Sequence, residues 1–533
     1  MGYISKLKLL VNTVKYLKPG QIINQVLVRI KPKENFLKYL KEDVKFHKAN
    51  LWLDELDGEN EYVERFLPEE LLDNRITLLN ETHSFDRWHY DDASHLWNFN
   101  VHYLEYLVAL KAKYKETNDE QYIRRLNDIL DDWYKNGAKD QDSNQAYTIS
   151  LRIINQLIIS DVVDDQQTLY RYIYAQYKYL LKHQEKHLLG NHYFENLKAI
   201  VICSLVFGEE KIYKKYISKL IKEADEEILP DGLHFERSLM YHKIIMEDEI
   251  RVAVVLRQFG REEYKSIIGY IKGMCTALYS LEGGLERTPL FNDAGEGVSK
   301  SAGFLLNAVK NRFDIVPEIR TCIDGYYRID ENGITVLMDC GELAPKYMPG
   351  HAHNDCLSYE LFLNGKPVLV NSGTYQYQGE HRSFFRSTKA HNTVTINDNE
   401  QSELWGEHRA GRKVSGVKVK AQDKTIIAEC RNYLKEKHIR ELTMQGGTLT
   451  VIDETEGKGK SFLHIAGDYE YKNGTISDES LTAEIEAINA EFSVESSLYA
   501  PSFGKMEKCT LLTFSWNDDN NKHGYKIKIE RSR

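Results

Sequence analysis

Apolar residues recur every three or four positions from about residue 95 to residue 320, as at Val101, Leu104, Leu107 and Val108. This spacing places them on one face of a helix, so it predicts a succession of amphipathic helices. Glycine and proline interrupt the pattern, for example in the Pro-Asp-Gly sequence at 230–232, and mark the connections between helices. Helices are expected over residues 197–207, 213–227, 241–259 and 262–280.

The pattern changes after about residue 325 to short runs rich in β-branched and aromatic residues. Turn sequences such as Asn364-Gly365 separate these runs. A series of helices followed by a series of strands predicts two structural layers or domains, with a boundary near 320–330 and a β-sandwich after it. Strands are expected over residues 334–339, 357–363, 368–370, 393–396, 449–452, 510–516 and 525–529.

Composition and charge narrow the class of protein. The chain of 533 residues has 42% hydrophobic and 28% charged residues, which is typical of a globular protein with large cores. A formal net charge of -10 argues against nucleic acid as a partner, because phosphate binding needs a broad basic footprint. The 34 Tyr fit either cores that are partly exposed to water or surfaces that bind sugars. The 7 Cys are widely spaced without a CxxC pair, so reduced thiols are expected.

The first 35 residues carry seven Lys or Arg and a single acid, Glu34. Their apolar runs are too short for a signal peptide, and no later run approaches the roughly 18 apolar residues of a membrane span. We therefore expect a location in the cytoplasm or at the inner face of the membrane. The basic segment is compatible with a solvated amphipathic helix pair or with contact to an anionic surface.

Four short segments combine His, Asn, Tyr and Glu at predicted element ends: GNHYFEN (190–196), DGLHFERSLMYH (231–242), GHAHND (350–355) and AHNT (390–393). Together, in this order and spacing, they resemble the heparinase II/III family of polysaccharide lyases, which includes heparin, heparan and alginate lyases. The resemblance continues through residues 371–375, Arg382 and residues 385–388, and it extends from about Trp97 to Arg412.

This resemblance implies an incomplete α/α toroid followed by an antiparallel β-sandwich, which agrees with the periodicity of the chain. We expect an N-terminal helical or extended segment (1–90) that packs on the toroid, the toroid itself (91–325) and the sandwich (326–533). Because the motifs occur in both parts, the catalytic residues should meet where the two parts join.

Elimination beside a uronate has three chemical requirements. The substrate carboxylate must be neutralised, the C5 proton removed, and the leaving glycosidic oxygen protonated. The resemblance assigns neutralisation to Asn191 and His192, and proton transfer to Tyr241 and His351, without settling which of the last two is the base. Read alone, Asn191 would be a helix cap and Tyr241 one packing tyrosine among many.

Two acids are expected to support these residues. Glu195 follows His192 by three positions, so the two can share a helix face, and the acid can then orient the imidazole. Glu236 lies in the second motif. The resemblance also suggests glycan contacts, each with a structural role as an open alternative, at Trp97, Asn100, His102, Tyr103, Arg152, Tyr375, Tyr377, Arg382 and Arg386.

The resemblance also implies a structural metal, usually zinc, bound by His353, by the residue at 371 and by His391. Family members have Asp at the middle position, whereas this chain has Asn371. A neutral amide is a weaker zinc ligand than a carboxylate, so zinc stays open. Without a metal, the two histidines would form a hydrogen-bonded layer that supports His351.

The leading hypothesis is thus a lyase that acts on an acidic, uronate-containing polysaccharide. One alternative is a catalytically silent protein of the same fold that binds or assembles glycans. Another is a metal-dependent glycan hydrolase built on His351, His353 and His391, which would leave Tyr241 and Asn191 without a role. Only elimination yields an unsaturated uronate that absorbs ultraviolet light. The identity of the polysaccharide and the oligomeric state cannot be predicted from the sequence.

Overall fold

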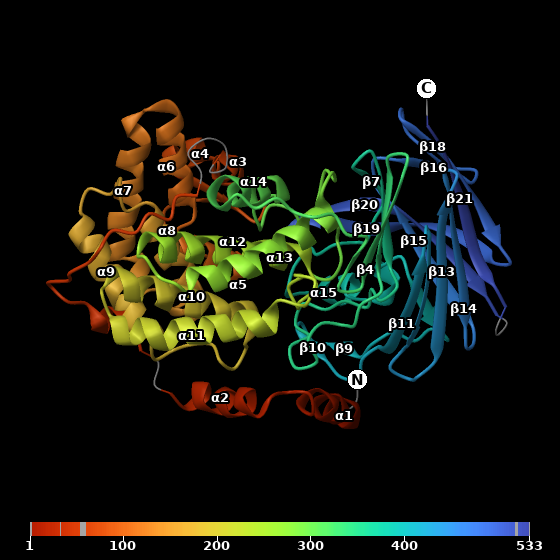
Figure 1. Cartoon of the computed structure of the whole chain (residues 1–533), viewed down its shortest axis with the longest axis horizontal. Coiled ribbons are helices and arrows are strands. Elements are labelled where there is room, and N and C mark those ends of the chain that lie inside the picture. The colour runs from red at the N-terminus through yellow and green to blue at the C-terminus, as the bar shows by residue number, and fades with distance from the viewer. Residues whose placement is uncertain (1–2, 32–33, 54–59, 518–520, 532–533) are drawn as a thin grey trace.

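The computed structural model describes residues 3–31, 34–53, 60–517 and 521–531. Helices dominate up to Phe313, and strands dominate from Cys322 onward (Figure 1). The helical part and the strand-rich part lie side by side along the longest axis of the molecule. The predicted fold class, an α/α toroid followed by an antiparallel β-sandwich, is confirmed.

The helices of the structure match the predicted periodicity. α7 begins after Asp119, whose side chain accepts a hydrogen bond from the Gln121 backbone and so caps the first turn. Its apolar residues, from Tyr122 to Trp133, recur at helical spacing and are buried. The helices are α1 (Tyr3–Val14), α2 (Pro19–Ile30), α3 (Asn60–Phe66), α4 (Pro68–Leu72), α5 (His95–Tyr103), α6 (Tyr106–Thr117), α7 (Glu120–Lys135), α8 (Ala146–Ile158), α9 (Gln166–Leu180), α10 (Gly190–Val206), α11 (Glu210–Glu227), α12 (Leu239–Gln258), α13 (Tyr264–Glu282), α14 (Ala302–Phe313) and α15 (Arg382–Phe385), with short 3-10 turns at 36–39, 137–139, 142–144 and 388–390.

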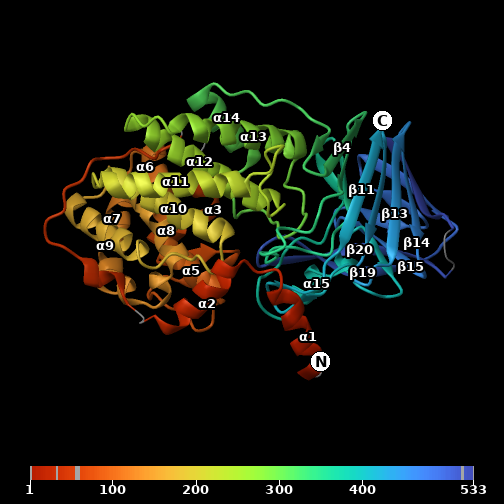
Figure 2. The same ribbon diagram turned by 60° about the horizontal axis from the view of Figure 1, so that its bottom comes forward.

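α10 occupies the middle of the helical part, between α8 and α12 (Figure 2). Its residues from Tyr193 to Val206 are all buried, because neighbouring helices cover every face. This helix begins with Asn191 near the start of its first turn, so its packing fixes where that side chain lies.

Two antiparallel sheets form the sandwich. One runs in the order β11-β12-β13-β14-β21-β18-β17-β16 and the other in the order β19-β20-β15-β7-β6-β5-β4-β3, with β8 pairing to β15. Exposed and buried residues alternate along β13 and β14, so one face of that sheet packs against the core. The strands are β3 (Cys322–Ile323), β4 (Tyr326–Glu331), β5 (Ile334–Asp339), β6 (Tyr359–Leu363), β7 (Lys366–Leu369), β8 (Val394–Ile396), β9 (Leu404–Trp405), β10 (Arg409–Ala410), β11 (Ser415–Gln422), β12 (Thr425–Arg431), β13 (Lys437–Gln445), β14 (Thr448–Thr455), β15 (Gly459–Ile465), β16 (Glu470–Lys472), β17 (Thr475–Ser477), β18 (Leu481–Ile488), β19 (Glu491–Ser502), β20 (Lys505–Trp516) and β21 (His523–Arg531).

A short hairpin precedes the toroid and was not expected as strand. β1 (Arg75–Leu78) pairs antiparallel with β2 (Glu81–Ser84) through a turn in which Leu79 and Asn80 have positive φ. Each strand has four residues, and only two of the eight, Ile76 and Leu78, are buried, so the apolar pattern carries little signal.

Candidate functional site

Asp293 lies at the centre of a buried network where the helical part meets the sandwich. It belongs to the loop between α13 and α14 (residues 283–301) and is fully buried. Its Oδ2 is 2.9 Å from His351 Nδ1, and its Oδ1 is 2.8 Å from His353 Nε2. Arg382 binds both carboxylate oxygens. One acidic side chain thus joins both histidines of the third motif to Arg382.

The electrostatics of this network favour an ionised aspartate. Burial alone would raise the pKa of Asp293, but the charge of Arg382 and the hydrogen bonds from His351 and His353 hold it well below its usual range. Burial lowers the pKa of His353 to about 4, so its imidazole is neutral. The carboxylate therefore accepts hydrogen bonds from both imidazoles, which fixes the tautomer of His351 with its proton on Nδ1.

Tyr241 and His351 come from different parts of the fold and lie against each other. Their ring centroids are 4.1 Å apart. The Tyr241 hydroxyl is 2.6 Å from the hydroxyl of Tyr377. Burial, together with the neighbouring Tyr377, raises the pKa of Tyr241 well above its usual value. Tyr241 is thus a protonated phenol in the folded protein.

Ser238 ties the start of α12 to the Asp293 loop. Its side chain accepts from the Tyr241 backbone N–H as the helix cap, and its hydroxyl donates to the Asp293 carbonyl at 2.7 Å. The Asp293 backbone N–H also donates to the His351 carbonyl at 3.0 Å. These contacts fix Tyr241 relative to Asp293 and His351.

Asn191 lies at the start of α10 and is bound by Glu236. Its side-chain amide donates to Glu236 Oε1 at 2.9 Å, and its backbone N–H donates to the same oxygen. Glu236 Oε2 is 3.8 Å from His351 Nε2. Gly190 has φ +55, and a Cβ there would collide with Met348 and lie 2.9 Å from Glu236 Oε1. Glycine at 190 adopts this φ without strain and leaves room for Met348 and Glu236 beside the helix start.

His192 is only partly buried, and Glu185, not Glu195, is its acidic partner. The Nδ1 atom lies 3.4 Å from Glu185 Oε2, and the ring lies 4.5 Å from that of Tyr147. Burial alone would lower the pKa of His192, but the charges of Glu185 and Glu236 outweigh burial and raise it. This corrects the expectation for Glu195, which points into the core and pairs with Lys198 at 2.6 Å.

The structure places several predicted glycan contacts in the protein interior. Arg152 is fully buried, and its donors bind Gln176 and the carbonyls of His102 and Ser143. Trp97 donates to the Glu81 carbonyl, and its ring has no exposed surface. Their donors are satisfied within the protein, so these residues hold the helices in place and do not reach a glycan.

The remaining predicted contacts in α5 differ in position. His102 is fully buried behind Trp88, and the Asn100 amide donates to the Leu96 carbonyl. Tyr103 lies 6.2 Å, ring to ring, from Tyr147, which in turn contacts His192. Tyr103 thus comes close to the site, whereas His102 is directed away from it, toward Asp140.

The two predicted arginines of the sandwich also have their donors engaged. Arg382 binds Asp293, and Arg386 donates to backbone carbonyls that include those of Ala352 and Glu407. Both are buried, so the expectation that they hold uronate or sulfate groups is corrected: they brace the segment that carries His351 and His353. Tyr375 and Tyr377 are partly exposed, and Tyr377 contacts Tyr241.

The residues expected to bind zinc provide two ligands of three. Among the described residues, His353 Nδ1 and His391 Nε2 are buried with no hydrogen-bond partner, as expected for metal ligands. Asn371 does not fit, because its Oδ1 already accepts from the Ser358 hydroxyl at 2.6 Å and lies 3.1 Å from His391 Nδ1. The donor set lacks a carboxylate, and the reaction proposed below has no step through zinc.

A second candidate metal group lies in the helical part. His89, Asp140 and Asp142 place one ligand atom each within 4.8 Å of one another. His89 Nδ1 is 3.7 Å from an oxygen of each carboxylate. His95 contacts Asp142 from another side at 3.0 Å. This triad is a candidate site for a cation.

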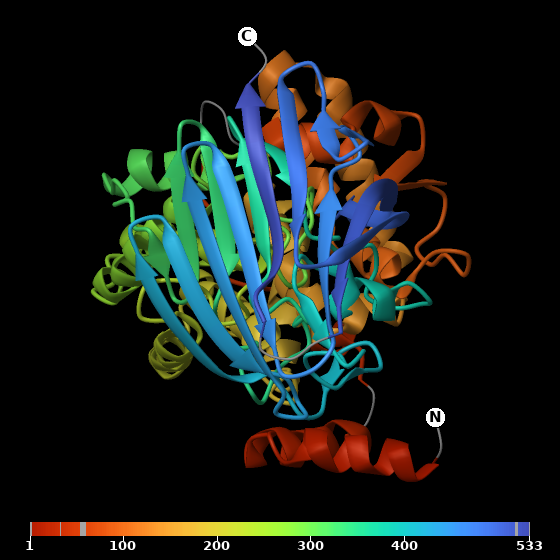
Figure 3. The same cartoon turned by 90° about the vertical axis from the view of Figure 1, so that its right-hand side faces the viewer.

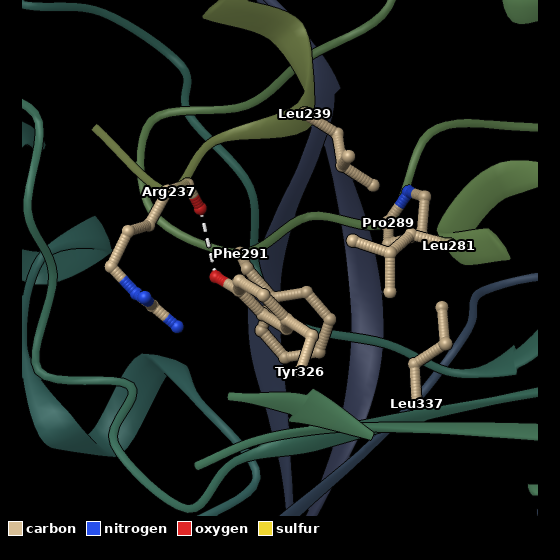
Figure 4. A pocket seen from close by; sticks show the side chains of 7 residues that line it. All are labelled: Arg237, Leu239, Leu281, Pro289, Phe291, Tyr326 and Leu337. Atoms are coloured by element: carbon tan, nitrogen blue, oxygen red, sulfur yellow. Dashed lines mark hydrogen bonds between the residues drawn. The ribbon is translucent and has the colours of Figure 1, made fainter. Parts of the chain in front are cut away.

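A small pocket lies behind the site, lined by Arg237, Leu239, Leu281, Pro289, Phe291, Tyr326 and Leu337 (Figure 4). The Tyr326 hydroxyl donates to the Arg237 carbonyl at 2.8 Å. The pocket has a volume of about 10 Å³, which accommodates about one water molecule. The pocket is therefore a packing gap between α12 and the sheet and too small for a sugar.

Two family profiles cover almost the whole chain. Residues 29–321 match the profile "Heparinase II/III N-terminus", and residues 324–527 match "Heparinase II/III-like, C-terminal". The chain belongs to the heparinase II/III family. The family predicted from the four motifs is thus confirmed, and the boundary between the two profiles coincides with β3, the first strand of the sandwich.

Relatives within the heparinase II/III family are distant. A heparin-sulfate lyase from Pedobacter heparinus is 20% identical over 376 residues, which cover 59% of this chain and about half (54%) of that protein. One from Bacteroides thetaiotaomicron is 21% identical over 80% of this chain and 69% of its own length. A heparinase III crystal structure has a TM-score of 0.71 at 17% identity, covering 93% of this chain and 88% of that one. A Pedobacter heparinus heparan sulfate lyase structure has a TM-score of 0.56. At these identities the structures show a shared fold.

Sequence reasoning missed Asp293, Glu185 and Tyr147. Asp293 follows Asn292, whose positive φ is invisible in the sequence, within a loop without periodicity. Glu185 and Tyr147 reach His192 from a loop and from a neighbouring helix. Nothing in the sequence distinguishes these residues from the other acids and tyrosines of the chain.

Proposed function

We propose that this protein is a polysaccharide lyase that cleaves an acidic, uronate-containing glycan by β-elimination. The observation that carries the proposal is the Asp293–His351 pair placed against a protonated Tyr241. It supplies a proton acceptor and a proton donor side by side. These are the two functions that elimination requires besides carboxylate neutralisation.

His351 acts as the base. Its Nδ1 proton is held by Asp293, so the lone pair of Nε2 is free to accept the C5 proton. Glu236 Oε2, at 3.8 Å from Nε2, stabilises the imidazolium that forms. This arrangement of carboxylate and imidazole is the one that general-base catalysis uses in other enzymes.

Tyr241 acts as the acid. Because burial keeps its hydroxyl protonated, it donates to the leaving oxygen more readily than it accepts a proton from carbon. The C5–H electron pair forms the C4–C5 double bond, and the bond from C4 to the glycosidic oxygen breaks. The oxygen takes the Tyr241 proton, and transfer of the C5 proton from His351 to Tyr241 restores both groups.

Asn191 and His192 neutralise the substrate carboxylate. The raised pKa of His192 favours the imidazolium, which provides a positive charge at the partly exposed side of the site. Asn191 supplies an amide whose position Glu236 fixes. These contacts strengthen as charge moves onto the carboxylate in the transition state, so they accelerate the reaction as well as bind substrate.

The names of the relatives, heparin-sulfate lyases, make heparan-type chains the first substrates to examine. Alginate, hyaluronan and capsular uronate polymers complete the panel.

Zinc at His353 and His391 stays a prediction. In the part of the chain that the structure describes, no helix is long and apolar enough to traverse a bilayer.

The test is to incubate the purified chain with each polymer and to follow ultraviolet absorbance and product mass. Elimination gives absorbing ends, whereas hydrolysis adds one water and gives none. His351→Ala serves as the matched inactive control. If the wild type binds a polymer but neither product forms, the chain is a glycan-binding protein. Hydrolysis products would indicate the metal-dependent hydrolase.

A further inference from the structure

The two N-terminal helices lie outside the main body, beneath the junction of the helical part and the sandwich (Figures 1 and 3). Polar side chains attach them there. In α1, Asn12 donates to Glu403 at 3.2 Å, and the Thr13 hydroxyl accepts from Trp405 at 3.0 Å. In α2, the buried Gln21 donates to the Tyr347 carbonyl at 3.3 Å.

Most apolar side chains of both helices are on the opposite, solvent-facing side, although Leu9 of α1 is buried. Of the eighteen large hydrophobic residues that are exposed among the described residues, ten lie between positions 7 and 30. Val11 is 60% exposed and Ile30 is 70% exposed. The spacing in each helix puts all of them except Val28 on one stripe. The members of this outer face are Leu7, Leu10, Val11, Val14, Ile22, Ile23, Val26, Leu27 and Ile30.

This arrangement inverts the usual one for a surface helix, which buries its apolar stripe and exposes its polar one. Here polar contacts hold the helices to the protein while the apolar stripe faces outward. An exposed contiguous apolar surface of this kind marks an interaction site.

The charge of the segment indicates what covers the outer face. Residues 1–33 contain seven Lys or Arg and no Asp or Glu, although the whole chain has a net charge of -10. Lys18 is paired with Glu226, whereas Lys6, Lys8, Lys15 and Arg29 are exposed around the apolar stripe. Aliphatic residues bordered by cations fit the boundary between anionic headgroups and acyl chains.

We propose that α1 and α2 dock this protein on an anionic lipid surface. A second copy of the chain fits less well, because a symmetric contact would bring two uniformly basic segments together. An acidic protein partner would match the charge, and the experiment below separates it from lipid. The proposal does not depend on the proposed lyase activity.

Docking would also bring the candidate site to the lipid surface. Gln21 of α2 binds the carbonyl of Tyr347, and the next residue, Met348, contacts Gly190 beside Asn191. Lys18 also lies over the Tyr347 ring at 3.9 Å. The outer face and the site are therefore on neighbouring surfaces, so docking would hold the candidate site close to the membrane.

The experiment is co-sedimentation of the full chain with vesicles of phosphatidylcholine alone and of phosphatidylcholine with roughly one third phosphatidylglycerol. The wild type should bind the anionic vesicles, and binding should weaken as salt rises. Val11→Asp combined with Val26→Asp should lower affinity at least roughly tenfold, because each removes an aliphatic side chain from the lipid contact.

The matched control is Val316→Asp combined with Ile319→Asp, at residues 67% and 69% exposed away from the outer face. This pair should bind vesicles like the wild type. Circular dichroism and thermal unfolding establish that both double variants are folded. Absence of binding, or equal binding by the Val11/Val26 variant, would overturn the proposal. So would a wild-type dimer, seen by light scattering, that the Val11/Val26 substitutions dissociate.

Discussion

The imidazole of His351 and the phenol of Tyr241 lie 4.1 Å apart, centroid to centroid, although the residues belong to the sandwich side and the helical side of the fold. Asp293 holds the imidazole from behind, and Tyr377 holds the phenol hydroxyl. The imidazole and the phenol are thus each held in place by a residue from another part of the chain.

Tyr241→Phe should lower kcat on a responsive polymer by about a hundredfold or more, because it removes the proton donor. Tyr377→Phe should have a smaller effect, since it removes only the hydrogen bond to Tyr241. The control is Tyr525→Phe, which breaks a similar buried hydroxyl pair, Tyr359–Tyr525 at 2.8 Å, inside the sandwich. Initial rates of ultraviolet absorbance measure all three. Near wild-type turnover of Tyr241→Phe would remove the acid from the proposed mechanism.

Asp293→Asn should reduce kcat about a hundredfold or more with little change in KM, because the tautomer of His351 is no longer fixed. The same change leaves Arg382 buried without its counterion, so the free energy of unfolding should fall by about 3–5 kcal/mol. Steady-state kinetics and urea unfolding measure the two effects. A variant that loses stability but keeps its kcat would show that Asp293 is structural only.

Glu185→Gln should lower the pKa of His192, because the charge of Glu185 helps to raise it. A lower pKa means that less imidazolium remains as pH rises through the neutral range, so KM should increase at a lower pH than in the wild type. The profile of KM between pH 5 and 8 measures this shift, in the range where histidine titrates. Glu296→Gln, in the Asp293 loop and without contact to His192, is the control. Superimposable wild-type and Glu185→Gln profiles would contradict the assignment.

Asn371→Asp should create or strengthen a zinc site. The Asn371 amide nitrogen has no partner among the described residues, so a carboxylate would put an oxygen there, beside two imidazoles that also have unpartnered nitrogens. Elemental analysis after dialysis should find about one zinc per variant chain and much less in the wild type. Equal zinc in both proteins would mean that Asn371 already suffices as a ligand or that the third ligand is another group.

Asp453 in β14 accepts two hydrogen bonds from Arg440, at 2.8 Å and 3.0 Å. Burial would raise its pKa, but the Arg440 charge and His438 hold the pKa well below its usual range. The ion pair therefore stabilises the fold above about pH 4 and loses this contribution as pH falls further.

Asp453→Asn should cost about 3–5 kcal/mol at pH 7, and the difference from the wild type should shrink below about pH 4. Denaturant unfolding at several pH values measures it. The control is Asp398→Asn, at an exposed pair with Lys460, which should change stability by less than about 1 kcal/mol. A pH-independent difference for Asp453→Asn would mean that the ionisation of Asp453 is not what stabilises β14.

The regular elements were predictable because their apolar periodicity reflects burial. The run 334–339 was expected as a strand and is β5, and the stretch 241–259 falls almost entirely within α12. The hairpin at residues 75–84 was not expected, because its turn depends on positive φ at Leu79 and Asn80 and its strands are mostly exposed. The local pattern of apolar and polar residues therefore predicts a helix or strand only where part of that element is buried.

Only those residues of the candidate site that belong to the four sequence motifs could be predicted. Asn191, Tyr241 and His351 come together as expected, but the partners that give them their electrostatic properties come from distant positions. Asp293 and Glu185 contribute through three-dimensional placement, which no local spacing encodes. Conversely, Arg382 looked like a substrate ligand because its chemistry suits carboxylates, and it binds a carboxylate of the protein itself.

The hydrogen bonds of Asp293 also affect the order in which the parts of the protein fold. His351, His353 and Arg382, which bind its carboxylate, lie 58, 60 and 89 residues further along the chain, in two separate segments. Closing such long loops costs conformational entropy that local helix formation does not, so these contacts form late in folding. A nascent chain that has completed α14 has all the helices around Asn191 and Tyr241 but no imidazole at 351. The catalytic site can therefore form only after the first third of the sandwich has been synthesised and has packed against the helical part.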